Sequence, residues 1–440
     1  MSVHLEPPAA VRWIARTLEE AGFETWAVGG AVRDALRGTP SGDWDLTTRA
    51  RPNDVRRIFR RTVPIGIEHG TVGVLARDQV MYEVTTFRRD VRTDGRHAVV
   101  SFADRLEDDL GRRDFTINAI AWHPLREDLR DPYGGADDLE RGVLRTVGAP
   151  DGRFREDYLR ILRALRFAGR FGLEIDADTW AAARTLVEHT RSLSAERIRD
   201  ELLKVLDQDP EPGRALGLYG ASGALATLYP ELERLRGRST PAGVDAWTLS
   251  VATVAELPMG RPYLRLAALL REVPPGEAAA LLTRLRLSNA RIDRTLHLAA
   301  AAPMPRPDAP DVDYRRWLSR VGPKRLAALG RLDLARARAL ASLGLGEDRR
   351  AGVAAAWRRA RKIRATRPPL EVGDLELDGR GLMALGLKPG PHFGVLLEGL
   401  LDWVLEDPER NRKELLVERV LAAVDAGGPT EDAEKEARGG

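Results

Sequence analysis

The chain has 440 residues, 43% of them hydrophobic, and its 69 Lys or Arg side chains nearly balance its 66 Asp or Glu side chains. This length corresponds to roughly three or four domains. The formal net charge of +3 excludes a uniformly basic chain, so a polyanionic partner would have to meet a locally basic surface. The absence of cysteine excludes disulfides, thiolate nucleophiles and cysteine-based zinc sites, and it fits a cytoplasmic protein.

No uncharged apolar run approaches the ~20 residues of a membrane span. The first ten residues also lack the apolar core of a signal peptide. We therefore expect no association with a membrane.

Helix and strand patterns alternate irregularly over the first 90 residues. Apolar residues at helical spacing predict a helix over 7–21 that ends at Gly22. Further predicted elements are strands over 23–28, 44–47, 70–75 and 80–87 and helices over 32–36 and 52–60. This irregular mixture predicts an α+β domain rather than a doubly wound parallel sheet.

Residues 88–99 are polar and contain glycine, which predicts a mobile loop. A turn-rich segment over 131–139 is expected to close the first domain. From about Phe154 onward nearly every segment has helical spacing. Breaks are predicted at 207–212 and 367–369, and the proline-rich segment 303–310 is expected to be a semi-rigid linker.

A glycine turn and two carboxylates lie close together near the N-terminus. Gly29 and Gly30 follow the first predicted strand, so bare backbone N–H groups can approach an anion there. Asp43 and Asp45 occupy alternate positions of the next predicted strand, so both carboxylates point to one face. Such a pair repels unless a cation intervenes, and Mg²⁺ is usually held by one or two carboxylates plus substrate phosphates. The combination predicts phosphoryl or nucleotidyl transfer.

Two further segments carry candidate site residues. Glu83, on the predicted strand 80–87, is either a third carboxylate that orients an attacking 3′-hydroxyl or an ordinary solvent-exposed glutamate. Arg112 and Arg113 precede Asp114. Their forked guanidinium groups suit a triphosphate, and Asp114 could accept a hydrogen bond from a ribose hydroxyl. A local ion pair at a helix start would account for the same residues without a ligand.

The segment 155–166 suggests how a nucleobase could be chosen. Asp157 and Arg160 are expected one turn apart on the same helix face, which an ordinary surface ion pair would also explain. Cytosine and adenine each present an amino donor beside a ring-nitrogen acceptor, and a carboxylate beside a guanidinium complements that pattern. Uracil and guanine present the opposite pattern and would be rejected. Arg163 and Arg166 could then contact phosphates.

The seven histidines show no H-E-x-x-H spacing. His69, before the predicted strand 70–75, is expected to be structural. This distribution argues against a zinc hydrolase.

Taken together, these segments resemble the class II tRNA nucleotidyltransferases, which comprise the CCA-adding enzymes and their bacterial poly(A) polymerase relatives. Five motifs of that family occur in order. They lie at 29–34 with 43–45, at 112–119, at 131–139, at 156–163 and at 195–206. Residues 387–394 are similar to the C-terminal part of the bacterial enzymes, and the resemblance is weakest over about 225–370.

The resemblance implies a polymerase-β-like head with a mixed sheet, followed by an all-helical neck, body and tail. The expected domains are a catalytic head over 1–150, a neck with the base-selecting helix over 151–207, a body over 208–310 and a tRNA-binding tail over 311–440. Body and tail would hold tRNA by its shape and backbone, as is usual for duplex RNA.

Site residues follow from the same resemblance. Asp43 and Asp45 are expected to hold Mg²⁺, and Glu83 completes the catalytic set. The residues expected at the nucleotide are Gly29, Gly30, Arg33, Arg112, Asp114, Asn118, Asp157, Arg160, Arg163 and Arg166.

The expected reaction is template-independent addition of C, C and A from CTP and ATP to the 3′ end of tRNA, with release of pyrophosphate. An enzyme that adds only A is the main alternative. CC-adding members characteristically lack the loop that 88–99 supplies here, which disfavours addition of C alone. Poly(A) polymerases tend to carry long basic extensions, and the absence of such a run from this sequence disfavours that activity. A tRNA-binding protein with an inactive head is the non-enzymatic alternative, and the intact Asp43 and Asp45 argue against it.

Overall fold

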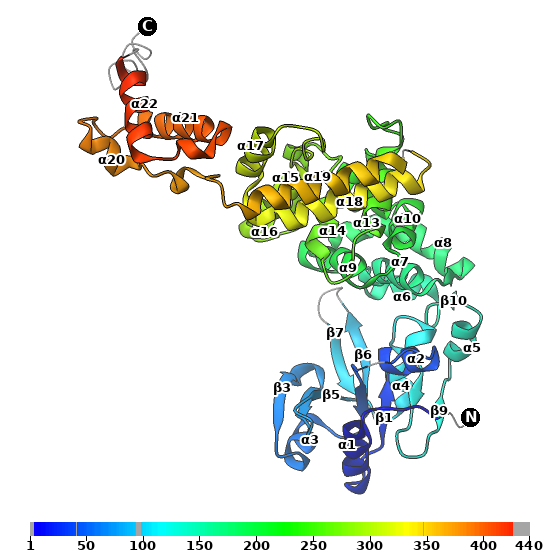
Figure 1. The fold of residues 1–440 in the computed structure, drawn as a ribbon. Helices are drawn as coiled ribbons and strands as arrows, with labels where there is room; N and C mark the ends of the chain where they lie inside the picture. Colours follow the sequence, from blue (N-terminus) through cyan, green and yellow to red (C-terminus); the bar gives the residue numbers. More distant parts are fainter. Residues whose placement is uncertain (1–3, 41, 94–97, 346, 426–440) are drawn as a thin grey trace. The chain divides into compact units, whose positions relative to one another are not determined.

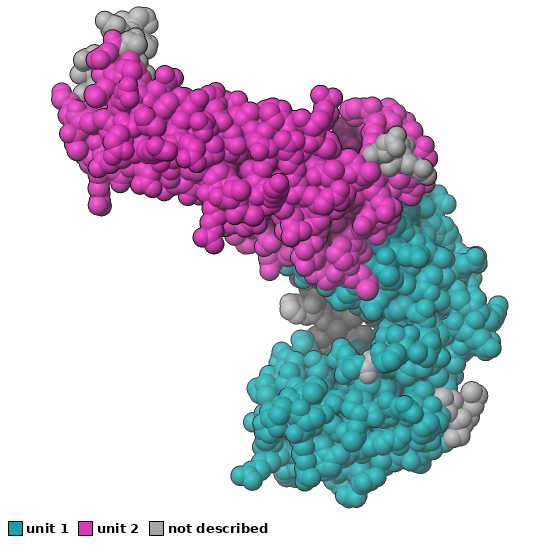
Figure 2. Space-filling model, in the orientation of Figure 1, with its two compact units in different colours: residues 1–234, 284–286 teal, residues 235–283, 287–440 magenta. Residues whose placement is uncertain are grey.

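The computed structural model describes residues 4–40, 42–93, 98–345 and 347–425. The chain forms two compact units (Figure 2). Unit 1 comprises residues 1–234 with 284–286, and unit 2 comprises residues 235–283 with 287–440. In the ranges that are described, every helix is too short or too polar to cross a bilayer.

The head of unit 1 is built on a mixed sheet (Figure 1). The strand order of this sheet is β3-β4-β5-β2-β1-β8-β9. All neighbouring strands pair antiparallel except β2 and β5, which pair parallel. The strands are β1 (Thr25–Val28), β2 (Asp45–Thr48), β3 (Thr62–Gly66), β4 (Thr71–Leu75), β5 (Met81–Thr86), β8 (Ala121–Trp122) and β9 (Leu129–Arg130). The expected α+β class is confirmed.

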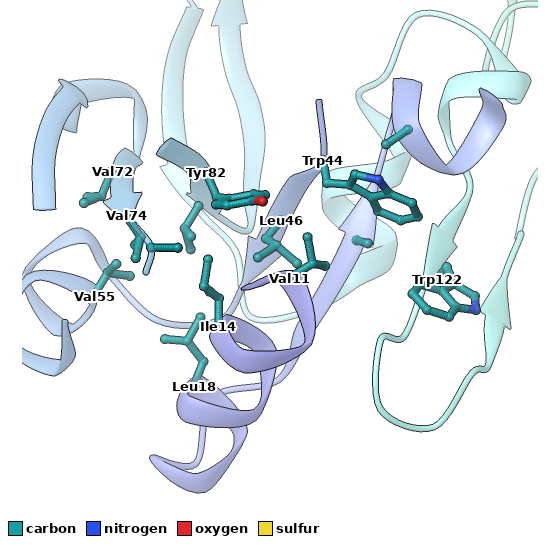
Figure 3. Packing of buried hydrophobic residues seen from close by; sticks show 14 of the residues in the cluster. Val11, Ile14, Leu18, Trp44, Leu46, Val55, Val72, Val74, Tyr82 and Trp122 are labelled. Atoms are coloured by element: carbon teal, nitrogen blue, oxygen red, sulfur yellow. The ribbon is translucent and has the colours of Figure 1, made fainter. Parts of the chain in front are cut away.

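One face of this sheet packs on α1 (Ala9–Glu20) and α3 (Pro52–Ile58). The helical spacing of α1 buries Val11, Ile14 and Leu18 in the same core as alternate residues of the strands (Figure 3). The strand residues of this core include Leu46, Val72, Val74, Tyr82 and Val84. The residues between them, among them Asp45 and Glu83, therefore belong to the opposite face.

The other elements of the head are α2 (Gly30–Leu36), α5 (Gly135–Glu140) and the 3₁₀ turns η1 (Ile67–His69) and η2 (Thr116–Asn118). Ala31 and Val32 of α2 and Ala136 of α5 pack with the core that contains α1. The opposite face carries α4 (Leu106–Gly111). Trp26 and Val28 of β1 pack there with Leu106 and Leu110 of α4. This packing leaves the ends of β1 and β2 open to a cavity.

The prediction of a loop over 88–99 was wrong. Strand β6 (Arg88–Thr93) pairs antiparallel with β7 (Ala98–Phe102), while residues 94–97 lie outside the described part. The physical reason lies in residues 98–102, after Gly95, which contain two valines and a phenylalanine. These residue types favour strands.

The rest of unit 1 is helical apart from one short parallel pair, β10 (Val143–Leu144) with β11 (Glu174–Ile175). Its helices are α6 (Pro150–Glu156), α7 (Leu159–Phe171), α8 (Ala177–Leu186), η3 (Val187–Ser192), α9 (Ala195–Gln208), α10 (Pro212–Ser222), α11 (Ala224–Leu228) and α12 (Pro230–Glu233). Helix α7 packs against α9 and α10 and so forms the centre of this region.

Unit 2 is helical throughout its described part. Its elements are α13 (Ala246–Ala255), α14 (Pro262–Leu269), α15 (Pro275–Arg284), α16 (Asn289–Ala299), α17 (Asp311–Val321), η4 (Pro323–Arg325), α18 (Leu326–Ser342), α19 (Glu347–Ala365), η5 (Val372–Asp374), α20 (Gly379–Ala384), α21 (His392–Glu406), η6 (Pro408–Arg410) and α22 (Lys413–Asp425). The proline-rich segment 303–310 lies between α16 and α17.

Candidate active site

A cavity of about 620 Å³ opens on the free face of the head sheet. Its walls come from β1, β2, β4 and β5, from the segment that carries α4 and η2, and from α7 and α9. All the candidate residues except Asp43 and Arg166 line it. The lining candidates are Gly29, Gly30, Arg33, Asp45, Glu83, Arg112, Asp114, Asn118, Asp157, Arg160 and Arg163.

Three carboxylates gather at the sheet end of the cavity. Leu46 of β2 pairs with Val84 of β5 in parallel register, so Asp45 and Glu83 lie side by side on the cavity face. Burial raises the pKa of Asp45 to about 6, and the nearby carboxylates of Asp43 and Glu83 add to this effect. Asp43 itself is exposed and lies two residues before β2, so only Asp45 of the two aspartates is on the strand. A cation would relieve this repulsion, so the donor set suits a hard divalent ion.

The carboxylates do not form a complete metal cage. In the described ranges, no three acidic or histidine side chains are placed so that they could hold a metal ion together. A Mg²⁺ ion at Asp43 and Asp45 would therefore need oxygen ligands from a substrate, which is the usual arrangement at phosphoryl-transfer sites.

The glycine turn is tightly packed against an arginine. Gly29 has a φ of 76°, and a Cβ there would lie 3.1 Å from Nη1 of Arg113, so only glycine fits without strain. The same guanidinium donates to the carbonyl of Asn118 at 3.2 Å and to Asp109 at 3.3 Å. Its buried Nε has no hydrogen-bond partner among the described groups. Within the described part of the head, one buried donor thus stays without a partner beside the glycine turn.

Asp109 fixes both arginines of the 112–113 pair. It is 1% exposed and also accepts from Nε of Arg112 at 3.0 Å. Burial alone would raise its pKa, but Arg112 and Arg113 lower the pKa below the usual value. The two guanidinium groups are therefore held in place before any ligand binds.

Asp114 belongs to a long-range network, not to the local ion pair considered above. It accepts from Nε of Arg163 on α7 at 2.7 Å and from the side chain of Asn118 at 2.9 Å. Burial would raise the pKa of Asp114, but Arg163 and the hydrogen bonds from Asn118 and the Phe115 backbone lower it to about 2. Asn118 in turn accepts from Arg33 at 2.6 Å. The network joins α2, η2 and α7 around the cavity.

Arg33 is placed by aromatic rings as well as by polar partners. Its guanidinium lies 4.3 Å from the ring centre of Phe171 on α7 and forms an ion pair with Asp34 at 2.8 Å. Burial lowers its pKa and Asp34 opposes that effect. Although Arg33 lines the cavity, it is only 5% exposed, so it contributes to the wall from a fixed position.

Asp157 and Arg160 both line the cavity, but the predicted single helix face was wrong. Asp157 lies in a break between α6 and α7 because its Oδ1 accepts from the backbone N–H of Leu159 at 3.0 Å, which starts the new helix. Its Oδ2 accepts from Arg197 on α9 at 2.6 Å. Arg160 pairs with Glu156 and donates to the carbonyl of Arg112 at 3.2 Å. Carboxylate and guanidinium are thus held by different partners.

The prediction that Arg166 contacts a phosphate was wrong. The structure places it outside the cavity, 4% exposed, where its Nε donates to Glu201 of α9 at 2.7 Å and its guanidinium stacks on Phe167. Glu201 is 1% exposed. A buried charge needs a paired charge nearby, and this pair joins α7 to α9 instead of contacting a phosphate.

Two family models match the chain. The model described as the poly A polymerase head domain matches residues 25–145, and the model described as the probable RNA and SrmB-binding site of polymerase A matches residues 172–235. The CCA-adding enzyme of Geobacillus thermodenitrificans is 39% identical over 284 residues, which span 62% of this chain and 69% of that enzyme.

The chain belongs to the CCA-adding enzyme family. This chain is similar to the crystal structure of the Bacillus stearothermophilus CCA-adding enzyme in complex with CTP, at 31% identity and a TM-score of 0.76. The match covers 96% of this chain and 100% of the Bacillus chain. The Thermotoga maritima CCA-adding enzyme complexed with tRNA shares the fold at 22% identity and a TM-score of 0.57. With several other curated CCA-adding enzymes, the matched segments span 47%, 53%, 55% and 62% of the relative.

As a CCA-adding family member, the chain is a nucleotidyltransferase, as the sequence predicted. The sequence reasoning missed three residues of the site. Asp109 and Arg197 were not considered, and Arg113 was noticed but not chosen. The spacing of Asp109, three and four residues before the two arginines, is the signal that could have identified it. Arg197 lies 40 residues from Asp157, and no local pattern indicates that contact.

Proposed function

We propose that this protein adds C, C and A to the 3′ end of tRNA, taking the nucleotides from CTP and ATP and releasing pyrophosphate. One observation carries the proposal: a single cavity brings together a glycine turn, the carboxylates of Asp45 and Glu83, fixed arginines and a carboxylate and guanidinium that can meet a base. Among its described lining residues, seven arginines face five carboxylates, a balance that favours an anionic ligand. Membership of the CCA-adding family supports the same reaction.

In the proposed mechanism, Asp43 and Asp45 would hold Mg²⁺, which would neutralise charge on the triphosphate and lower the pKa of the attacking hydroxyl. Glu83 accepts a hydrogen bond from the RNA 3′-hydroxyl and orients it. The 3′-hydroxyl releases its proton to solvent, and its oxygen forms a bond to the α-phosphorus while the bond from that phosphorus to the bridging oxygen breaks, so pyrophosphate leaves. Arg112 and Arg113, held by Asp109, bind the phosphates by forked hydrogen bonds.

Base selection is assigned to Asp157 and Arg160. Each keeps part of its hydrogen-bonding capacity because a carboxylate has about four acceptor sites and a guanidinium has five donors. Arg197 and Glu156 hold the two groups in place, so a base that presents the opposite pattern meets unpaired polar groups. Cytosine and adenine fit, and uracil and guanine do not.

The proposal extends to the other parts of the chain and to its location. The head (1–150) and neck (151–207) carry the reaction, and the body (208–310) and tail (311–440) bind tRNA. We place the enzyme in the cytoplasm, which the absence of cysteine supports.

One assay tests the reaction. Purified protein is incubated with tRNA that ends before CCA and with tRNA that ends in CC, with CTP, ATP or both, and the products are sized. We expect three nucleotides on the first RNA and one A on the second. Addition of A alone to the second RNA, with none to the first, would make the protein an A-adding enzyme, and a long A tail would make it a poly(A) polymerase.

The Asp43→Ala variant tests the metal assignment. In a filter-binding assay it should bind tRNA as the wild type does. Its rate of nucleotide incorporation should fall at least about a hundredfold, because one of the two carboxylates assigned to Mg²⁺ is removed. The inactive-head alternative predicts no incorporation by the wild type. Retained turnover in Asp43→Ala would contradict the assignment of Asp43.

A further inference from the structure

The cavity face of the head sheet continues beyond Glu83 into an exposed apolar surface. Val63 and Ile65 on β3 and Met81 on β5 are 44%, 39% and 47% exposed. Tyr82 and Val84 belong to the buried core on the other face. Because side chains alternate along a strand, Met81 and Glu83 project together from the cavity face.

These side chains gather around a glycine. Gly73 of β4 is paired with Glu83 on one side and with Val63 on the other. A Cβ on Gly73 would lie 2.7 Å from Cδ1 of Ile65 and 2.8 Å from Sδ of Met81, so both side chains lie over the glycine. We call Val63, Ile65, Gly73 and Met81 the apolar shelf.

The shelf is continuous with the candidate active site. The cavity lining includes Glu83 and also Thr71, which lies two residues before Gly73 on the same strand. Large apolar side chains at the border of a sheet cost solubility and invite unwanted pairing. Their presence beside a strongly charged cavity therefore indicates that they contact a ligand.

We propose that the apolar shelf holds the 3′-terminal nucleoside of the RNA that is being extended. The proposal rests on the proposed function. In an in-line displacement, the attacking oxygen and the leaving pyrophosphate lie on opposite sides of the α-phosphate. The triphosphate candidates Gly29, Gly30 and Arg113 lie at the β1 side of Asp45, whereas the shelf lies on β5, β4 and β3. The nucleoside that bears the 3′-hydroxyl therefore lies on the shelf side, next to Glu83.

The chemistry of the shelf suits an RNA end whose last base changes. Each addition of C, C or A replaces the terminal base by a different or newly placed one. Aliphatic side chains and a thioether pack on the face of any base without reading its hydrogen-bonding edge. A polar pocket that matched one terminal base would reject the next.

The test uses an RNA minihelix that ends before CCA, and a second one whose last nucleotide is an abasic ribose with a free 3′-hydroxyl. For the wild type, removal of the base should lower kcat/KM for the RNA about tenfold, a typical cost of losing an apolar contact. The double variant Ile65→Ser with Met81→Ser should show about the same loss on the normal RNA and no further loss on the abasic RNA. Its KM for CTP at saturating RNA should equal that of the wild type.

Val80→Ser is the matched control. Val80 is 45% exposed but precedes β5 and is not among the side chains over Gly73, so its variant should behave as the wild type on both RNAs. Thermal unfolding checks that each variant is folded, and Met81→Ser alone should give a smaller loss if the double variant unfolds.

Two results would overturn the proposal. One is a wild type that extends both RNAs equally well, and the other is a double variant whose response to base removal equals that of the wild type. Both are read from working enzymes, so they leave the proposed function intact. A wild type that adds no nucleotide to either RNA would instead overturn the proposed function, and the shelf proposal with it.

Discussion

Two aspartates of the cavity show how its charges are divided. Burial raises the pKa of both, but their neighbours act in opposite directions. Asp45 faces the carboxylates of Asp43 and Glu83, and its pKa rises to about 6. Asp114 faces Arg163, and its pKa falls to about 2. A bound cation would therefore stabilise the charged form of Asp45, whereas the guanidinium of Arg163 already stabilises the charged form of Asp114.

Asp114 should make the free energy of unfolding depend on pH in the acid range. Its folded pKa lies below the unfolded value of 3.8, so its contribution is fully present above about pH 4 and is lost as the pH falls towards 2. We expect Asp114→Asn to destabilise the protein at pH 5, and this deficit to shrink by about 2 kcal/mol between pH 4 and pH 2. Urea unfolding of both proteins at several pH values measures it. A deficit that stays constant over this range would contradict the pairing.

Asp157 should control which base enters. In Asp157→Ala the acceptor that matches the amino group of cytosine or adenine is gone, so incorporation of UTP relative to CTP should rise about ten- to a hundredfold. Competition assays with mixed nucleotides measure this ratio.

Asp151→Ala is the control for base choice. Asp151 pairs with Arg155 on the exposed side of α6, and its side chain is 58% exposed. The variant removes an acid from the same segment without touching the cavity, so selectivity should not change. An unchanged ratio in Asp157→Ala as well would exclude Asp157 from base selection.

At the scale of elements, α7 connects the base-selecting residues to the rest of unit 1. Its N-terminal turn carries Arg160 and its middle carries Arg163. Gly169, near its end, lets α10 approach closely, because a Cβ there would lie 2.5 Å from the Cβ of Ala215 and 2.6 Å from its backbone N. The position of α7 therefore depends on a residue that has no side chain.

Gly169→Ala should lower the thermal unfolding midpoint. The added methyl group meets backbone atoms that cannot move away, which typically costs about 1–3 kcal/mol. Gly217→Ala on α10 is the matched control. Nothing lies within 4 Å of a Cβ at Gly217, so alanine should stabilise the protein by about 0.5–1 kcal/mol through its better helix propensity and raise the midpoint. Equal shifts in the two variants would contradict the close crossing.

Local patterns predicted the elements well and the contacts between them poorly. The helical spacing of α1 and the glycine turn are local, and each formed the expected element, whereas β2 begins at Asp45 and leaves Asp43 outside the predicted strand. The break at Asp157 was missed because it depends on a carboxylate that accepts from the backbone N–H of Leu159, the first residue of α7. Arg166 was misplaced because its partner, Glu201, lies 35 residues away, and burial of a charge depends on such partners and not on spacing.

At the scale of the whole molecule, the near balance of charge leaves RNA binding to local surfaces. The second half of α19 is such a surface. Residues 358–364 contain five cations and no acid, and Arg358, Lys362 and Arg364 are exposed. If these cations contact RNA phosphates, binding should weaken steeply with salt because counterions are released.

Replacement of Arg358, Lys362 and Arg364 by glutamine should reduce the slope of log affinity against log salt by about 2–3, since each phosphate contact contributes about 0.9 for duplex RNA treated like duplex DNA. Filter binding of tRNA between about 50 and 200 mM salt measures the slope.

A second triple variant serves as the control for charge number. Arg16, Arg56 and Arg60 are exposed and lie in or just after α1 and α3, on the side of the head sheet away from the cavity. Their replacement by glutamine should leave the slope unchanged. Equal slopes in the two triple variants would show that net charge, and not α19, governs the affinity.

The parallel register of β2 and β5 restricts how the length of this chain can vary. Insertion of one residue within β5 before Glu83 would turn Glu83 into the core and bring Val84 to the cavity, because faces alternate along a strand. A residue added to the turn over 76–80 leaves the pairing of β4 with β5 intact. Insertions and deletions in related sequences should therefore collect in that turn, while the strands keep their length from one lineage to the next.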